Sequence, residues 1–84
     1  MPGQVASLQR RIEILEPERQ RCERQLVEAT SEAAAFSKAG EVKDADRALK
    51  RAARLRTEVA SVMGEMDTLR SLVAARVAQT RRPL

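Results

Sequence analysis

The sequence contains no histidine, no tryptophan, no tyrosine and only one cysteine. Without histidine, the chain lacks the side chain that most often acts as a general base near neutral pH and most often binds metals. A single cysteine cannot form an intrachain disulfide or a cysteine-rich zinc site. The serine and threonine hydroxyls have no base to activate them, so no catalytic constellation can be assembled. We therefore expect no enzymatic activity, no cofactor and no metal, and an intracellular, reducing location, either cytoplasmic or cytoskeletal.

Long apolar runs are also missing. No segment approaches the roughly 20 consecutive apolar residues that a transmembrane helix requires, so we expect no membrane span. The first residues lead into a charged stretch, unlike a secretory signal peptide. Only one residue is aromatic, and there are three glycines and three prolines. Because Ala, Leu, Glu, Arg and Lys dominate instead, the composition favours long helices over strands.

What the chain does contain is two series of apolar residues spaced alternately three and four apart. The first series is Val5, Leu8, Ile12, Leu15, Arg19, Cys22, Leu26, Ala29, Ala33 and Phe36. The second series is Ala45, Ala48, Ala52, Leu55, Val59, Val62, Met66, Leu69, Val73 and Arg76. Such alternation, sustained over more than four heptads, predicts the seam of a coiled coil. At its seam position the thiol of Cys22 is expected to be buried and unreactive.

The segment between the two series predicts a tight connection. Gly40 is placed to end the first helix with a positive φ angle, and Asp44 to cap the second helix. So short a connection makes the helices antiparallel, and facing residue numbers must then have a constant sum. Every facing pair of the two series, from Phe36 with Ala45 outward, sums to 81. We predict an all-α fold for residues 1–84, an antiparallel two-helix coiled-coil hairpin with helices over about 4–38 and 44–81 and a turn over about 39–43.

Several large apolar residues fall outside the seam in the half of the hairpin far from the turn. They are Ile14, Met63, Leu72 and Val77. We interpret them as a second interface, because they widen the apolar stripe beyond what one partner helix covers. Scattered surface side chains are the alternative interpretation. Since the alanine-rich half buries little apolar area, we expect self-association first, as a dimer with a four-helix arrangement.

Three residues weaken the helices or the seam, two at one level of the rod and Arg19 in the adjacent layer. Pro17 lies on the outer face of the first helix without shifting the heptad phase, so we expect a kinked but continuous helix. Gly64 is the only glycine inside the second helix, at the same level. Arg19 is the one charge in the interior of the seam. Together they indicate either a local imperfection, with Arg19 extending its guanidinium to water, or a hinge that fits the rod to a curved partner.

Basic residues are unevenly distributed. The net charge is +4, and residues 39–84 supply the whole excess. Four cations lie within about 100° of one another on the outer face of the second helix. They are Arg47, Lys50, Arg51 and Arg54, called here the basic stripe. The stripe is either a solvated face or a surface for nucleic acid or another anionic partner. Nucleic acid is the less favoured partner, because no aromatic side chain is interleaved to stack on bases.

Residues 49–59 resemble the second-helix core of UVR domains. The matching residues are Ala52, Ala53, Arg56 and Val59. The departures are Leu49, Lys50 and Thr57, which stand where the family pattern has an aromatic residue, an acid and an aspartate. UVR domains are short helical hairpins of bacterial excision-repair and some Clp-associated proteins, and they act by pairing with another hairpin. The resemblance implies hairpin pairing as a mode of action rather than a role in DNA repair.

These features predict a non-enzymatic protein–protein interaction or scaffold module that acts through coiled-coil packing, as part of a larger assembly, cytoskeletal or trafficking protein. Its expected partner is a protein, either a second copy or a partner helix. The alternative function, of a different class, is a basic helical module that binds nucleic acid or another anionic surface through the basic stripe.

Overall fold

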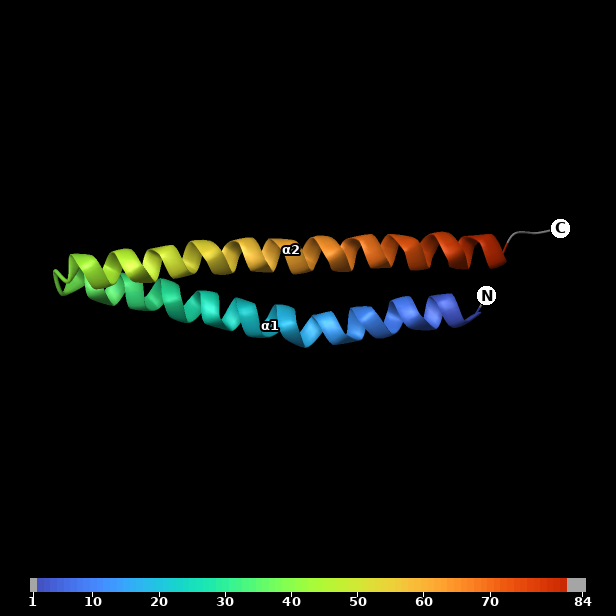
Figure 1. The fold of residues 1–84 in the computed structure, drawn as a ribbon, viewed down its shortest axis with the longest axis horizontal. Helices are drawn as coiled ribbons and strands as arrows, with labels where there is room; N and C mark the ends of the chain where they lie inside the picture. The colour runs from blue at the N-terminus through green and yellow to red at the C-terminus, as the bar shows by residue number, and fades with distance from the viewer. Residues whose placement is uncertain (1, 82–84) are drawn as a thin grey trace.

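The computed structural model describes residues 2–81 and shows two long helices, α1 (Pro2–Lys38) and α2 (Val42–Thr80). They run antiparallel, so that the start of α1 and the end of α2 lie at the same end of the rod (Figure 1). Within the described range there is no strand. The Cα atoms extend over 69 × 16 × 12 Å. The predicted all-α helical hairpin is therefore confirmed.

A tight cap made by residues 39–41 connects the helices. Gly40 has a φ of 77°, as the sequence predicts. The N–H of Glu41 donates to the carbonyl of Phe36 at 2.9 Å, and the N–H of Gly40 donates to that of Ser37 at 3.1 Å. This pair of hydrogen bonds is the Schellman motif, which satisfies carbonyls left free at the end of a helix. The positive φ favours glycine because a Cβ there would cost roughly 1–2 kcal/mol.

The start of α2 differs from the sequence-based expectation. The helix begins at Val42 and its N-cap is Glu41, which makes no side-chain capping hydrogen bond. The expectation that Asp44 caps α2 was wrong, because the Schellman motif ends at Glu41 and the chain enters the helix directly. The carbonyl of Glu41 already accepts a hydrogen bond from the N–H of Ala45 at 2.9 Å. Asp44 instead lies in the first turn, near the positive end of the helix dipole.

The seam follows the two predicted series. Every member of both series is buried or half-buried, and of the other side chains that the structure describes only four are not exposed. Those four are Glu16, Glu23, Asp44 and Val77. The buried core residues are Leu15, Cys22, Ala29, Ala33, Ala45, Ala48, Ala52, Leu55 and Met66. The hydrophobic periodicity alone therefore identifies the faces that the two helices present to each other.

The two ends of the rod are packed differently. Near the turn, alanine layers let the backbones approach closely, and in Figure 1 the two ribbons lie nearest to each other there. At the far end, the larger side chains of Leu8, Ile12, Leu69 and Val73 are only half-buried. In the two-helix hairpin, part of the apolar surface of these side chains therefore stays exposed to water.

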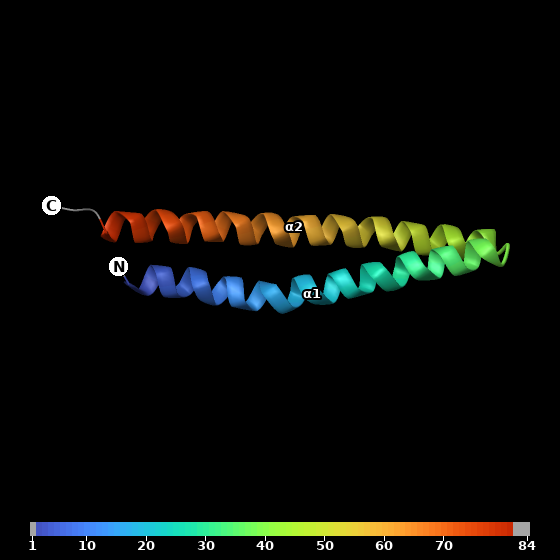
Figure 2. The same cartoon turned by 180° about the vertical axis from the view of Figure 1, so that it is seen from behind.

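Pro17 does not break α1. The helix is continuous through it, as predicted. Proline has no N–H to donate and its ring crowds the carbonyl four residues earlier, which bends a helix. Figures 1 and 2 show α1 bowed away from α2 in its middle part, whereas α2 is close to straight. Gly64, inside α2, has nothing within 4 Å of the position that a Cβ would occupy.

Candidate functional site

The two sides of the seam provide a frame for every candidate surface. With Val5 and Ala45 at heptad position a, the seam consists of a and d positions. In an antiparallel pair the e positions of both helices border one side of the seam and the g positions border the other. We call these sides the e flank and the g flank.

Ion pairs between the helices bridge the g flank. Nη2 of Arg11 lies 3.3 Å from Oε1 of Glu65, and Arg51 pairs with Glu32 nearer the turn. All four residues are at g positions and are about half exposed. Exposed pairs of this kind contribute on the order of 0.2–1 kcal/mol each. Their main effect is to favour this register and orientation of the helices.

The e flank carries a charged cluster centred on Arg19. Its Nη1 donates to Oε2 of Glu23 at 2.7 Å, and its Nη2 donates to Glu16. Nη2 of Arg70 on α2 lies 3.9 Å from Oε2 of Glu16, the cross-helix ion pair of this flank. Arg19 therefore keeps its charge at a half-buried seam position by turning its guanidinium toward two carboxylates at the edge.

The pKa values in this cluster follow from its hydrogen bonds. The hydrogen bond from Arg19 is the largest cause of a lowered pKa at Glu16, and the positive charges of Arg19 and Arg70 add to it, while burial opposes it. The pKa of Arg19 is raised, first by its hydrogen bond to Glu16 and then by that to Glu23. Glu16 and Arg19 are therefore both charged at neutral pH, and their pairing is a structural ion network rather than a proton donor or acceptor.

An apolar row runs along the e positions of α2. It consists of Val42, Leu49, Met63 and Val77, with Arg56 and Arg70 at the two intervening e positions. Leu49 is 54% exposed and Met63 is 45% exposed. Residues seven apart lie on nearly the same side of a helix, so these side chains follow one line beside the seam. We call this line the apolar row.

The four residues expected to form a second interface lie in three places. Met63 and Val77 belong to the apolar row. Leu72, 42% exposed, is at a g position, because nine residues separate it from Met63 and turn it about 180° around α2. Ile14 is exposed on the outer side of α1, at a c position. Leu49 belongs to the row and was missed, because the sequence reasoning considered only the end far from the turn.

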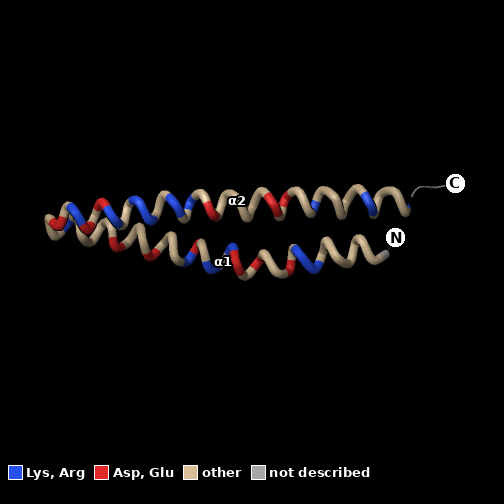
Figure 3. The backbone as a smooth tube through the Cα atoms, viewed as in Figure 1, with Lys and Arg blue, Asp and Glu red and all other residues tan. Residues whose placement is uncertain are grey.

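The basic stripe is partly neutralised within the hairpin. Nζ of Lys50 lies 3.0 Å from Oδ2 of Asp46, and Arg51 is paired with Glu32. Arg47 and Arg54 make no ion pair within residues 2–81. Figure 3 shows the basic residues of α2 concentrated in the half nearer the turn, with acidic positions on both helices among and beside them. The local charge that the stripe presents is therefore smaller than four adjacent cations suggest.

Cys22 lies in the core, 6% exposed. Burial raises the pKa of its thiol, and the nearby charge of Glu58 raises it further. The Sγ atom lies 3.7 Å from Oε2 of Glu58, to which the thiol donates a hydrogen bond. A protonated, covered thiol is a poor nucleophile, so this position packs the seam and offers no reactive group.

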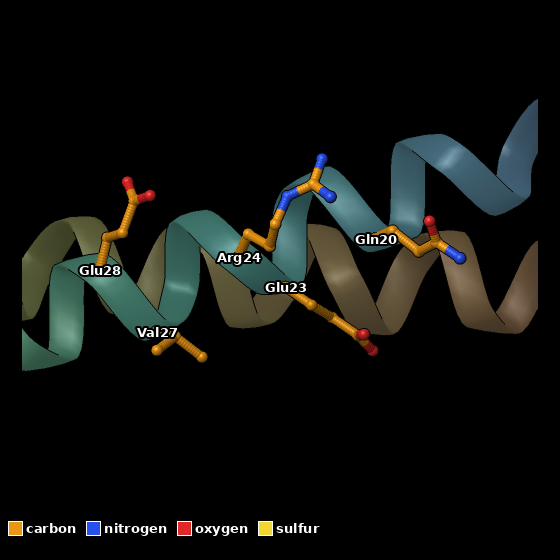
Figure 4. A pocket seen from close by; sticks show the side chains of 5 residues that line it. All are labelled: Gln20, Glu23, Arg24, Val27 and Glu28. Carbon is orange, nitrogen blue, oxygen red and sulfur yellow. The ribbon is translucent and has the colours of Figure 1, made fainter.

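The surface hollows of the rod are shallow. Figure 4 shows one on the outer side of α1, where the labelled side chains all come from α1 and point in different directions. It is lined by Gln20, Glu23, Arg24, Val27 and Glu28. An enclosed ligand site needs convergent polar groups on concave apolar walls, and this hollow has neither. Among the described residues, no group of three His, Cys, Asp or Glu side chains could hold a metal ion.

Neither described helix has a stretch long and apolar enough to span a bilayer. Comparison with protein-family models, with curated proteins and with solved structures gives no match. The case for a function therefore depends on the surfaces of the hairpin itself.

Proposed function

We propose that this hairpin is a non-enzymatic protein–protein interaction module that acts through packing of its helices against another protein. The observation that carries the proposal is the apolar row. Leu49 and Met63 remain about half exposed beside a seam whose own apolar residues are buried or half-buried. Covering a large apolar side chain fully contributes roughly 1.5–3 kcal/mol, so completing the burial of several half-exposed ones favours association.

The contrast between the flanks supports a directional interface. The g flank has two ion pairs between the helices and one exposed leucine, Leu72, whereas the e flank has one such ion pair and the whole apolar row. A partner that docks on the e flank meets apolar side chains beside the charged cluster of Arg19. An apolar centre bordered by charge is the usual composition of a specific interface. The resemblance of residues 49–59 to UVR hairpins fits this mode of action, since those hairpins act by pairing.

The basic stripe gives weaker support to nucleic-acid binding. Two of its four cations are paired with carboxylates, which leaves Arg47 and Arg54. Affinity for a nucleic acid grows with the number of phosphates neutralised, and two contacts neutralise few. We therefore expect no tight binding of duplex DNA at physiological salt.

Site-specific photo-crosslinking in cells tests the proposed function. A benzophenone amino acid replaces Met63 in the apolar row, and in a matched control it replaces Ser31, an exposed residue on the outer side of α1. We expect adducts with polypeptide from position 63 and few from position 31. Equal yields from both positions, or adducts with nucleic acid alone, contradict the proposal.

A further inference from the structure

The apolar row is one half of a second heptad stripe on α2. The b positions, three or four residues from each e position, carry Ala53, Ala60 and Ala74, with Asp46 and Asp67 between them. All five are outside the seam and exposed. Asp46, Ala53 and Ala60 lie between the exposed members of the apolar row, and Asp67 and Ala74 lie between Met63 and the half-buried Val77. Together the b and e positions alternate four and three from residue 42 to residue 77, as a coiled-coil seam does. We call this surface the outer stripe.

The outer stripe belongs to α2 and has no equivalent on α1. The corresponding positions in the middle of α1 are Glu13, Glu16, Gln20 and Glu23. A partner helix would therefore find an apolar surface on α2 and a polar, acidic one on α1. The stripe on α2 combines large residues at e with small ones at b, which suits a facing helix whose large and small residues are offset.

We infer that the outer stripe pairs with that of a second copy of the chain, antiparallel and in the register where facing residue numbers sum to 123. The inference rests on the proposed function and names its partner. In this register Met63 faces the partner's Ala60, and Leu49 faces the partner's Ala74. Arg56 faces the partner's Asp67. Two-fold symmetry repeats each contact, so the interface contains two such ion pairs.

Charge complementarity selects this arrangement over its neighbours. A parallel pair would place Arg56 beside the partner's Arg56, and like charges that face each other are destabilising. A shift to a sum of 116 pairs Asp46 with the partner's Arg70 but sets Asp67 against the partner's Leu49. A shift to 130 sets Met63 against the partner's Asp67. The sum of 123 sets Asp46 against the partner's Val77, but among these registers it alone places Arg56 opposite an acid and both Leu49 and Met63 opposite alanine.

The two charged groups are available for this contact. Arg56 makes no ion pair with any of residues 2–81, and Asp67 has one exposed neighbour, Nη1 of Arg70 at 3.7 Å. The outer stripe lies about 100° around α2 from the seam. The α1 helices of both copies therefore lie on the same side of the α2 pair, and the assembly is a four-helix arrangement.

Reversal of the two charges tests the pairing and its register. Arg56→Asp alone sets two acids face to face twice per dimer, and Asp67→Arg alone sets two arginines face to face. Each variant should weaken the dimer on the order of tenfold or more. In an equimolar mixture, however, the heterodimer restores both ion pairs, so the mixture should dimerise like the parent chain. Arg47→Asp changes an exposed residue that lies outside the outer stripe. It is the matched control and should leave the dimer unchanged.

Light scattering with refractive-index detection measures the molar mass without tryptophan or tyrosine absorbance, against a monomer mass of 9.3 kDa. Circular dichroism checks that each variant keeps its helices. A monomeric parent chain, single variants that still dimerise, or a mixture that stays monomeric overturns this inference. A monomeric parent chain that still crosslinks to another polypeptide from position 63 leaves the proposed function standing, whereas loss of that crosslink removes the function as well.

Discussion

Ala29 of α1 and Ala52 of α2 face each other in one layer of the seam, and each is 0% exposed. Methyl groups are all that separates the two backbones at this level, so the helices approach closely. A layer of this kind buries little apolar area and depends on close fit instead.

Enlarging this layer should destabilise the hairpin. Ala52→Leu inserts three heavy atoms where no space remains, and we expect a loss of about 1–3 kcal/mol in the free energy of unfolding. Ala35→Leu, on the exposed side of α1, should change it by less than about 0.5 kcal/mol. Urea unfolding followed by circular dichroism, at one protein concentration, measures both. Equal midpoints for the two variants would show that the alanine layers are not closely packed.

Removing the two helix-weakening residues should raise stability. Pro17→Ala restores a backbone hydrogen bond and should add up to about 3 kcal/mol. Gly64→Ala should add about 0.5–1 kcal/mol, because the new methyl group meets nothing within 4 Å. Thermal unfolding checks both values. If Pro17→Ala also leaves the crosslinking yield from position 63 unchanged, the bend in α1 is not a hinge for the partner.

The cluster around Arg19 makes stability depend on acid pH. The pKa of Glu16 is lowered in the folded state, chiefly by its hydrogen bond from Arg19. A lowered folded-state pKa means that the contribution of Glu16 is present above its unfolded-state pKa of about 4.3 and is lost as the pH falls below it. Glu16→Gln removes this titration. The loss of melting temperature between neutral pH and pH 3 should therefore be smaller in Glu16→Gln than in the parent chain, and an equal loss would contradict the assignment.

The thiol of Cys22 should resist modification in the folded chain. Burial and the charge of Glu58 raise its pKa, which lowers the thiolate fraction at neutral pH. Alkylation by iodoacetamide should be at least about tenfold slower in buffer than in urea, where the thiol is exposed and its pKa is near 8.5. Mass spectrometry follows the reaction. Fast alkylation of the folded hairpin would show that the seam opens at this layer.

The seam was predictable because it depends on one property, the spacing of apolar residues, which needs no atomic detail. The same is true of Gly40, whose positive φ is a local requirement of the turn. The first residue of α2 was not predictable in this way. It lies two residues before the expected start, because the hydrogen bonds of the turn end at Glu41 and make that residue, not Asp44, the N-cap. The pairing of Arg51 with Glu32 depends on long side chains that several partners can reach, so spacing alone cannot assign it.

The candidate surface was only partly predictable, for a geometric reason. The sequence groups Met63 and Leu72 because both lie in the half of the hairpin far from the turn. The nine residues between them nevertheless place their side chains on opposite flanks of α2. The heptad positions separate these two residues. They also place Leu49 and Met63, which are two heptads apart, on the same flank. How the ion pairs between the helices are divided between the two flanks, by contrast, emerges only when both helices are in place.

The central claim is that the e flank of α2 binds a second copy of the chain. Its most direct test compares the molar mass of the parent chain with that of two variants. Leu49→Gln/Met63→Gln removes the two largest side chains of the apolar row, and Leu72→Gln removes a similarly exposed leucine on the g flank. The account predicts a mass above 9.3 kDa for the parent chain and for Leu72→Gln, and a mass of 9.3 kDa for the double variant. A monomeric mass for all three chains, or dissociation caused by Leu72→Gln alone, would contradict it.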